Sequence, residues 1–198
     1  MSPQKRQASF SRTTTETDIQ FHLVLDGAGE NRIATGIGFL DHMLAQMSRH
    51  GLIDLTVAAR GDLAIDDHHT VEDVGIALGR ALREALGDGA GIVRYGHAIV
   101  PMDEALVLCA VDVSGRGLSV CDLNLPVERL GTMATEMIPE FVRALAHNAG
   151  FTLHLRQLAG ENGHHIAEAA FKALGRGIGM AVAQSERVSG IPSTKGVL

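Results

Sequence analysis

The chain has 198 residues, of which 45% are hydrophobic and 20% are charged, a composition that excludes a disordered chain and suits one large globular domain or two small ones. Its formal net charge is −6 at pH 7 and it has no tryptophan, so it lacks the basic, aromatic-rich composition of nucleic-acid-binding proteins. We therefore expect a globular protein with no nucleic-acid partner.

The first half of the chain alternates predicted strands with predicted helices. Ile19, Phe21 and Leu23 recur at every second position, which is typical of a strand with one buried face. We expect strands over residues 8–15, 17–26 and 52–59, a short strand that ends at residues 36–38, and helices over residues 39–50 and 67–86. Residues 1–7 are polar, and we expect them to be frayed.

A glycine-rich break at residues 87–91 marks the expected end of the first half. The second half repeats the same order, with strands expected over residues 93–100, 104–113, 118–123 and 151–158 and helices over residues 135–149 and from residue 163 onward. The predicted fold class is α+β and internally duplicated. We expect a single domain, residues 1–198, made of two pseudo-symmetric halves of residues 1–90 and 91–198, each with a β-sheet and two helices.

The two halves repeat polar residues as well as apolar ones. The motif His-His-x-x-Glu, followed by Ala-Leu-Gly-Arg, begins at His68 and again at His164, 96 positions later. On a helix, residues four apart share a face, so His68 can act with Glu72 and His164 with Glu168. The second histidine of each copy is turned about 100° away, so each copy is expected to reach two different centres.

Imidazole nitrogens and carboxylate oxygens are ligands of divalent transition metals, and neither copy has a thiolate that would favour a closed zinc site. Manganese, iron and zinc are the candidates. One His-His pair alone is as often a solvated surface feature as a ligand set, but two copies at matched spacing favour metal binding. The order of residues differs from the His-Glu-x-x-His motif of zinc proteases.

The predicted helix over residues 39–50 carries a polar stripe of His42, Gln46 and His50, whose usual fate is a solvated face. Allowing one inserted residue, His42 in the first half falls opposite Glu140 in the second. Both helices of each half therefore carry side chains that can bind metal. The polar tail contains Ser-Thr-Lys at residues 193–195, whose hydroxyls and cation suit a phosphate.

Six stretches of the sequence resemble the imidazoleglycerol-phosphate dehydratase family of histidine biosynthesis. They are FLDHML at residues 39–44, DHHTVED at 67–73, PMDEA at 101–105, SGR at 114–116, HHIAEAAFKA at 164–173 and PSTKG at 192–196. The resemblance implies a lyase that converts imidazole glycerol phosphate to imidazole acetol phosphate and water, with two manganese ions per active site. It also implies a fold related to the second domain of ribosomal protein S5, and a 24-subunit homo-oligomeric shell with active sites between subunits.

The resemblance also assigns roles to individual residues. The implied metal ligands are His42, His68, His69, Glu72, His164, His165 and Glu168. An eighth ligand is commonly the histidine of Glu-His-Phe-Phe, and here the corresponding stretch is Pro139-Glu140-Phe141-Val142, so Glu140 would supply an oxygen ligand. The implied substrate-binding residues are Glu16, His42, Gln46, His50, His68, His69, Glu72, Arg94, Arg116, His164, Lys172, Ser193, Thr194 and Lys195, with the cations and the tail binding the phosphate.

The implied reaction explains the need for two metal ions. The departing hydrogen is not α to a carbonyl, so enolate stabilisation is missing. If both ring nitrogens bind metal, the imidazole becomes an imidazolate that expels the C3 hydroxyl, and loss of the C2 proton then gives an enol that tautomerises to the ketone. Metal ions act here as Lewis acids and as a template, and a carboxylate moves protons. Glu16, Glu72 and Glu168 are the candidate catalytic carboxylates, with Glu16 favoured because it need not be a ligand.

Two other functions fit histidine and glutamate ligands: a dinuclear metal hydrolase acting on a phosphoester, and a non-enzymatic shell that stores metal. The family motifs argue against both, since neither function needs a phosphate-binding set, here Arg94, Arg116, Lys172 and residues 193–195, beside an imidazole-sized gap. Cys109 and Cys121 lie in apolar sequence without a Cys-x-x-Cys motif, and no apolar run reaches the length of a membrane span. We therefore expect a cytoplasmic protein with no membrane partner.

Overall fold

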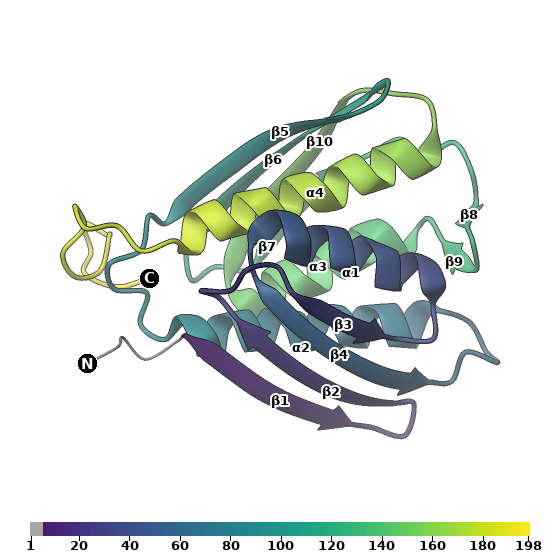
Figure 1. Ribbon diagram of the computed structural model, residues 1–198, viewed down its shortest axis with the longest axis horizontal. Helices are drawn as coiled ribbons and strands as arrows, with labels where there is room; N and C mark the ends of the chain where they lie inside the picture. Colours follow the sequence, from purple (N-terminus) through teal and green to yellow (C-terminus); the bar gives the residue numbers. More distant parts are fainter. Residues whose placement is uncertain (1–5) are drawn as a thin grey trace.

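The computed structural model describes residues 6–198, which form two four-stranded sheets with four helices between them (Figure 1). The strands of the first half are β1 (Gln7–Thr13), β2 (Thr17–Val24), β3 (Asn31–Ala34) and β4 (Asp54–Gly61), and its helices are α1 (Gly38–Gly51) and α2 (His68–Leu86). The second half contains β5 (Tyr95–Met102), β6 (Ala105–Val113), β7 (Leu118–Asp122), β8 (Arg129–Leu130), β9 (Met133–Ala134), α3 (Met137–Ala149), β10 (Phe151–Ala159) and α4 (Gly163–Val182). Residues 1–5 of the expected frayed end lie outside the described residues.

The two large sheets have the same topology. The first has the order β1-β2-β4-β3 and the second has the order β5-β6-β10-β7, and in each the last pair is parallel while the others are antiparallel. The parallel pairs follow from the helix that connects their strands, α1 in one half and α3 in the other. The predicted internally duplicated α+β fold is confirmed. The boundary near residue 90 stays a prediction.

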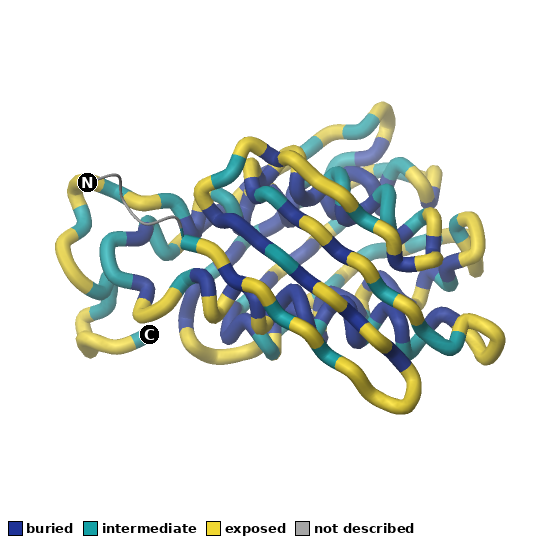
Figure 2. Tube along the Cα trace, turned by 60° about the horizontal axis from the view of Figure 1, so that its bottom comes forward, coloured by how far each residue is buried: buried dark blue, intermediate teal, exposed yellow. Residues whose placement is uncertain are grey.

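Each sheet buries one face against the helices. Buried and more exposed residues alternate along β6 and along most of β2, and the same alternation is visible across the strands of the first sheet in Figure 2. Helix α2 packs on β1 and β2, and α4 packs on β5 and β6. The helices also pack across the halves, because α1 lies against α4 and α2 lies against α3. The core is therefore shared by both halves.

The glycine of the duplicated Ala-Leu-Gly-Arg motif explains this helix pairing. A Cβ atom added to Gly79 on α2 would lie 2.6 Å from the carbonyl oxygen of Leu145 on α3. A Cβ atom added to Gly175 on α4 would overlap the carbonyl oxygen of Met47 on α1. The two glycines thus allow the helix backbones to approach closely at equivalent positions of the two halves.

All four helices begin at the same end of the molecule (Figure 1). Helix α4 is capped there by Asn162, whose side-chain oxygen accepts from the backbone N–H groups of His164 and His165. The small β8–β9 hairpin, which the sequence analysis missed, lies at this end too, and Ala134 N donates to the buried carboxylate of Asp67 at 2.5 Å. In the described part of the chain, no helix is both long enough and apolar enough to cross a membrane.

Candidate active site

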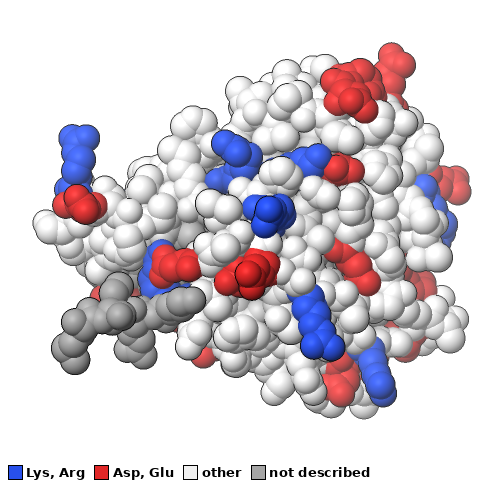
Figure 3. Space-filling model, viewed as in Figure 1, with Lys and Arg blue, Asp and Glu red and all other residues white. Residues whose placement is uncertain are grey.

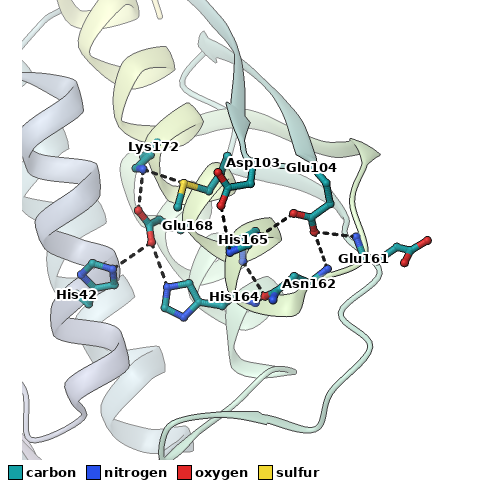
Figure 4. A network of polar contacts seen from close by, with 10 residues as sticks. His42, Asp103, Glu104, Glu161, Asn162, His164, His165, Glu168 and Lys172 are labelled. Atoms are coloured by element: carbon teal, nitrogen blue, oxygen red, sulfur yellow. Dashed lines mark hydrogen bonds and ion pairs between the residues drawn. The ribbon is translucent and has the colours of Figure 1, made fainter.

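Three potential metal ligands from α1 and α4 converge at the end where the helices begin. The Nε2 atoms of His42 and His164 lie 3.2 Å and 3.1 Å from Oε2 of Glu168 (Figure 4). One ligand atom of each residue lies within 4.8 Å of the other two. We call this group the His42 cluster. It joins the predicted i, i+4 pair of His164 and Glu168 to a histidine from the other half of the chain.

The carboxylate of Glu168 is buried and ionised. Burial opposes its ionisation, but hydrogen bonds from Lys172 and His42 outweigh this effect and lower the pKa of Glu168 to about 2. The Nζ atom of Lys172 lies 2.7 Å from Oε1 of Glu168, one helical turn farther along α4. At neutral pH the carboxylate is therefore a charged group that can bind a cation, rather than a proton donor.

A second group forms from α2 and α3 and is equivalent to the first by the duplication. Ligand atoms of His68, Glu72 and Glu140 lie within 4.8 Å of one another, and we call this group the Glu140 cluster. The Nε2 atom of His68 is 3.8 Å from Oε2 of Glu72. Arg143 contacts both carboxylates, and its hydrogen bond to Glu140 lowers the pKa of that carboxyl group.

The second histidine of each pair points away from these clusters, as the helix geometry predicts. The Nδ1–H of His69 donates to Asp62 at 2.9 Å, and the Nδ1–H of His165 donates to Glu104 at 2.7 Å (Figure 4). These hydrogen bonds raise the pKa of both imidazoles, and the one from His165 lowers the pKa of Glu104 to about 2. A carboxylate on Nδ1 fixes the ring and leaves Nε2 available to a metal ion.

The donor sets fit a divalent transition metal ion. Each cluster offers imidazole nitrogen and carboxylate oxygen, which are ligands of manganese, iron and zinc, and neither cluster contains a cysteine. Three side-chain ligands leave positions open for a substrate and for a further protein ligand. His69 and His165, whose oriented rings point away from the clusters of their own chain, are candidates for that further ligand only in the cluster of another copy of the chain.

Glu16 lies beside one of these oriented histidines. It belongs to the turn between β1 and β2, and its Oε1 atom is 3.8 Å from Nε2 of His69. Its side chain is 51% exposed, so it is free to reach a substrate. In the second half, Asp103 in the turn between β5 and β6 lies 3.5 Å from Nε2 of His165, which is an equivalent arrangement.

The predicted polar stripe of α1 faces cations of α4. Gln46 and His50 follow His42 at intervals of one helical turn, as Lys172 and Arg176 follow Glu168 on α4. His50 has a lowered pKa because of burial and of the positive charges of Lys172 and Arg176. Figure 3 shows lysine and arginine side chains gathered over α1 and α4 on this face.

The remaining predicted phosphate-binding residues lie elsewhere. Arg94 donates to Asp112 at 2.9 Å and to the carbonyl oxygen of Pro192 at 2.8 Å, and Arg116 lies 3.8 Å from the same aspartate. The tail with Ser193, Thr194 and Lys195 therefore stays near Arg94. Figure 1 places this tail at the end of the molecule opposite the N-termini of the helices. A single chain does not bring these residues to its own metal-ligand clusters.

Sequence reasoning missed three residues that position the candidate ligands: Asp62, Glu104 and Arg143. Glu104 directly precedes β6 in the chain, as Glu16 directly precedes β2. This shared place in the sequence was the available signal for Glu104. Asp62 gave no comparable signal, because it lies 7 positions from His69 and outside its helix, and the contact of Arg143 with Glu72 spans 71 positions. The pair of Arg143 and Glu140, three positions apart on α3, was a local signal that the sequence analysis did not use.

The sequence is similar to that of one known protein family. The sequence model of the family "Imidazoleglycerol-phosphate dehydratase" matches residues 35–178. Relatives of that name from Desulforamulus reducens and Moorella thermoacetica are 60% and 58% identical over 193 residues, which is 98% of this chain and 98% of each relative.

Two solved structures have the same fold. The crystal structure of imidazoleglycerol-phosphate dehydratase from Staphylococcus aureus superposes with a TM-score of 0.82 at 38% identity and covers 90% of this chain and 99% of its own. The enzyme from Pyrococcus furiosus, solved in complex with (S)-C348, gives 0.83 at 43% identity and covers 96% and 100%. The chain therefore belongs to the imidazoleglycerol-phosphate dehydratase family.

Proposed function

We propose that this chain removes water from imidazole glycerol phosphate to give imidazole acetol phosphate, using two manganese ions held by the His42 and Glu140 clusters. Membership of the family makes the chain a hydro-lyase of histidine biosynthesis. The observation that carries the metal proposal is the convergence of two histidine and carboxylate groups at equivalent positions of the two halves. When bound, manganese supplies Lewis acidity toward the imidazole ring of the substrate and a template that holds it.

The side chains of this protein supply proton transfer and substrate orientation. Glu168 has a pKa of about 2, so it is ionised at neutral pH and holds no proton to donate. Glu16 is exposed beside His69, so we assign it the removal of the C2 proton and its delivery to the departing C3 hydroxyl. The C2–H and C3–O bonds break, water leaves, and the enol becomes the ketone. Glu72 acts as a ligand that orients the substrate.

We further propose that the complete site forms between subunits of a 24-subunit shell. The distance between the two ends of one chain supports this, because Arg94, Arg116 and the tail lie opposite the clusters (Figure 1). In an assembly, the tail end of one subunit would bring these cations to the clusters of another, where they bind the phosphate. The oriented rings of His69 and His165, which point away from the clusters of their own chain, support the same arrangement.

The direct test is to incubate the purified chain with imidazole glycerol phosphate, with manganese or after chelation, and to measure the ketone product and inorganic phosphate. We expect ketone in the presence of manganese only, and no phosphate release. Release of phosphate would instead indicate a phosphoester hydrolase. Glu16→Gln should bind manganese normally and lose most activity, whereas the control Glu30→Gln, which changes an exposed residue before β3, should behave as the wild type. Full activity of Glu16→Gln would contradict the assigned proton transfer.

A further inference from the structure

The two clusters are equivalent in position but not in charge. The His42 cluster contains one carboxylate, that of Glu168, whereas the Glu140 cluster contains two, those of Glu72 and Glu140. The difference arises because α1 offers an imidazole, that of His42, where α3 offers a carboxylate. A divalent ion is attracted more strongly by two carboxylates than by one.

The neighbouring cations differ as well. Lys172 lies 2.7 Å from Glu168 and balances its charge, while the position 96 residues earlier on α2 is Ile76, which has none. In the Glu140 cluster the cation is Arg143 of α3. Its guanidinium lies 3.4 Å from Glu72 and also pairs with Glu140.

These cations leave different net charges at the two clusters. One carboxylate against one ammonium leaves no formal charge at the His42 cluster. Two carboxylates against one guanidinium leave one negative charge at the Glu140 cluster. The Glu140 cluster is therefore the better electrostatic site for a cation.

The two cations also differ in how easily they can move. The side chain of Lys172 is only 16% exposed, and its Nζ atom lies 3.5 Å from Sδ of Met102. The side chain of Arg143 is 60% exposed, so its guanidinium can turn into water with little loss of solvation. An ion that enters the Glu140 cluster can thus displace Arg143, while an ion that enters the His42 cluster keeps Lys172 as a close positive neighbour.

We propose that the two clusters are unequal metal sites: the Glu140 cluster binds a divalent cation first and more tightly, with Arg143 as its displaceable counter-ion, and Lys172 weakens the His42 cluster. This proposal rests on the proposed function, which requires both clusters to bind metal. It adds the order in which they fill.

The test is to titrate the chelated full-length protein with Mn²⁺ at pH 7, following free Mn²⁺ by electron paramagnetic resonance and heat by calorimetry. We expect two classes of site whose dissociation constants differ by about tenfold or more, since charge count tunes the affinity of such sites. His68→Ala should remove the tight class, and His164→Ala should remove the weak one. The proposal is overturned if His68→Ala removes the weak class and His164→Ala the tight one. It is also overturned if the wild type has two classes of equal affinity.

Two substitutions test the charges directly. Glu140→His gives both clusters the same ligand types, so the two constants should approach each other. Arg143→Gln should tighten the first class several-fold, while Arg156→Gln, which changes another exposed arginine paired with Asp122, should change neither. Because the side chain of Arg143 is exposed, Arg143→Gln should fold normally. It therefore still tests the proposal if Glu140→His does not fold.

The outcomes separate this proposal from the proposed function. An unchanged ratio of constants in Glu140→His, or no tightening in Arg143→Gln, overturns the inequality and leaves the metal-dependent dehydratase standing. If the wild type binds no Mn²⁺, both proposals fall.

Discussion

The Nε2 atom of His42 and the Oε2 atom of Glu168 lie 3.2 Å apart, although 126 positions separate the two residues in the chain. The equivalent cluster also joins the halves, because His68 comes from α2 and Glu140 from α3. Each cluster therefore needs both halves of the duplication. The close packing of α1 on α4 and of α2 on α3 is what brings the candidate ligands together.

The oriented second histidines provide a test of the ligand assignment. We expect His69→Ala or His165→Ala to lose bound manganese and activity together, because each removes an imidazole whose Nε2 is held ready by a carboxylate on Nδ1. Metal content is measured by mass spectrometry of the desalted protein. His154→Ala, on an exposed position of β10, is the control. Wild-type metal content in both test variants would show that these histidines are not ligands.

The cations near the tail provide a test of phosphate binding. Arg116→Ala or Lys195→Ala removes a charge-assisted contact of roughly 1.5–3 kcal/mol, so substrate binding should weaken about tenfold or more. Manganese content should not change, since both residues lie away from the clusters. The measurement is steady-state kinetics with imidazole glycerol phosphate, with Arg156→Ala as the matched control. Unchanged kinetics in both test variants would remove these residues from the substrate site.

Metal binding and assembly should be linked. Chelation of manganese at neutral pH, or protonation of the histidines near pH 5, should give a smaller particle, because ligands must be deprotonated to bind metal across an interface. Light scattering after size-exclusion chromatography measures the mass, and manganese should restore the large species. If the chelated protein keeps both its size and its thermal stability, metal does not join the subunits.

The contact of Gly175 with α1 should be sensitive to a single methyl group. Gly175→Ala would press a Cβ atom against the carbonyl oxygen of Met47, and backbone cannot rotate away, so we expect a loss of about 1–3 kcal/mol in the free energy of unfolding. Moving α1 relative to α4 should also weaken metal binding at the His42 cluster. Gly38→Ala, where no atom lies within 4 Å of the added Cβ, is the control for denaturant unfolding. Equal stability of the two variants would contradict the tight helix contact.

The ion pair of Glu104 and His165 should shape the stability of the metal-free protein between acid and neutral pH. The pKa of Glu104 is lowered from 4.5 to about 2, so its contribution is present above pH 4.5 and is lost as the pH falls toward 2. The pKa of His165 is raised above 6.5, so its contribution is present below pH 6.5 and is lost as the pH rises through the raised value. The pair therefore contributes most to the stability of the metal-free protein between pH 4.5 and pH 6.5.

Glu104→Gln should remove this contribution. We expect its melting temperature, followed by circular dichroism in the presence of a chelator, to fall below that of the wild type most clearly near pH 5.5, between the ordinary values of the two groups. At pH 9 the difference should shrink. A constant difference from pH 5 to pH 9 would mean that the hydrogen bond contributes without any linkage to proton binding.

The duplicated architecture and the local ligand pairs could be predicted from the sequence. Alternation with a period of two and apolar faces with a period near 3.6 depend only on residues close in the chain, so the helices and main strands were found with small shifts in their ends. The same local geometry joined His68 to Glu72 and His164 to Glu168, and turned the second histidine of each pair away.

Only the tertiary structure decided which helices share a cluster and which charges surround it. The sequence contained Asp62, Glu104 and Arg143, but it did not show their contacts with His69, His165 and Glu72, because a hydrogen bond between different elements leaves no periodic pattern. The repeat made His42 and Glu140 equivalent. It did not show that each of them lies beside the histidine and glutamate of the His-His-x-x-Glu helix in the opposite half. That pairing is set by long-range packing at Gly79 and Gly175, where the absence of a side chain lets two backbones meet, and such contacts depend on the whole fold rather than on any local stretch.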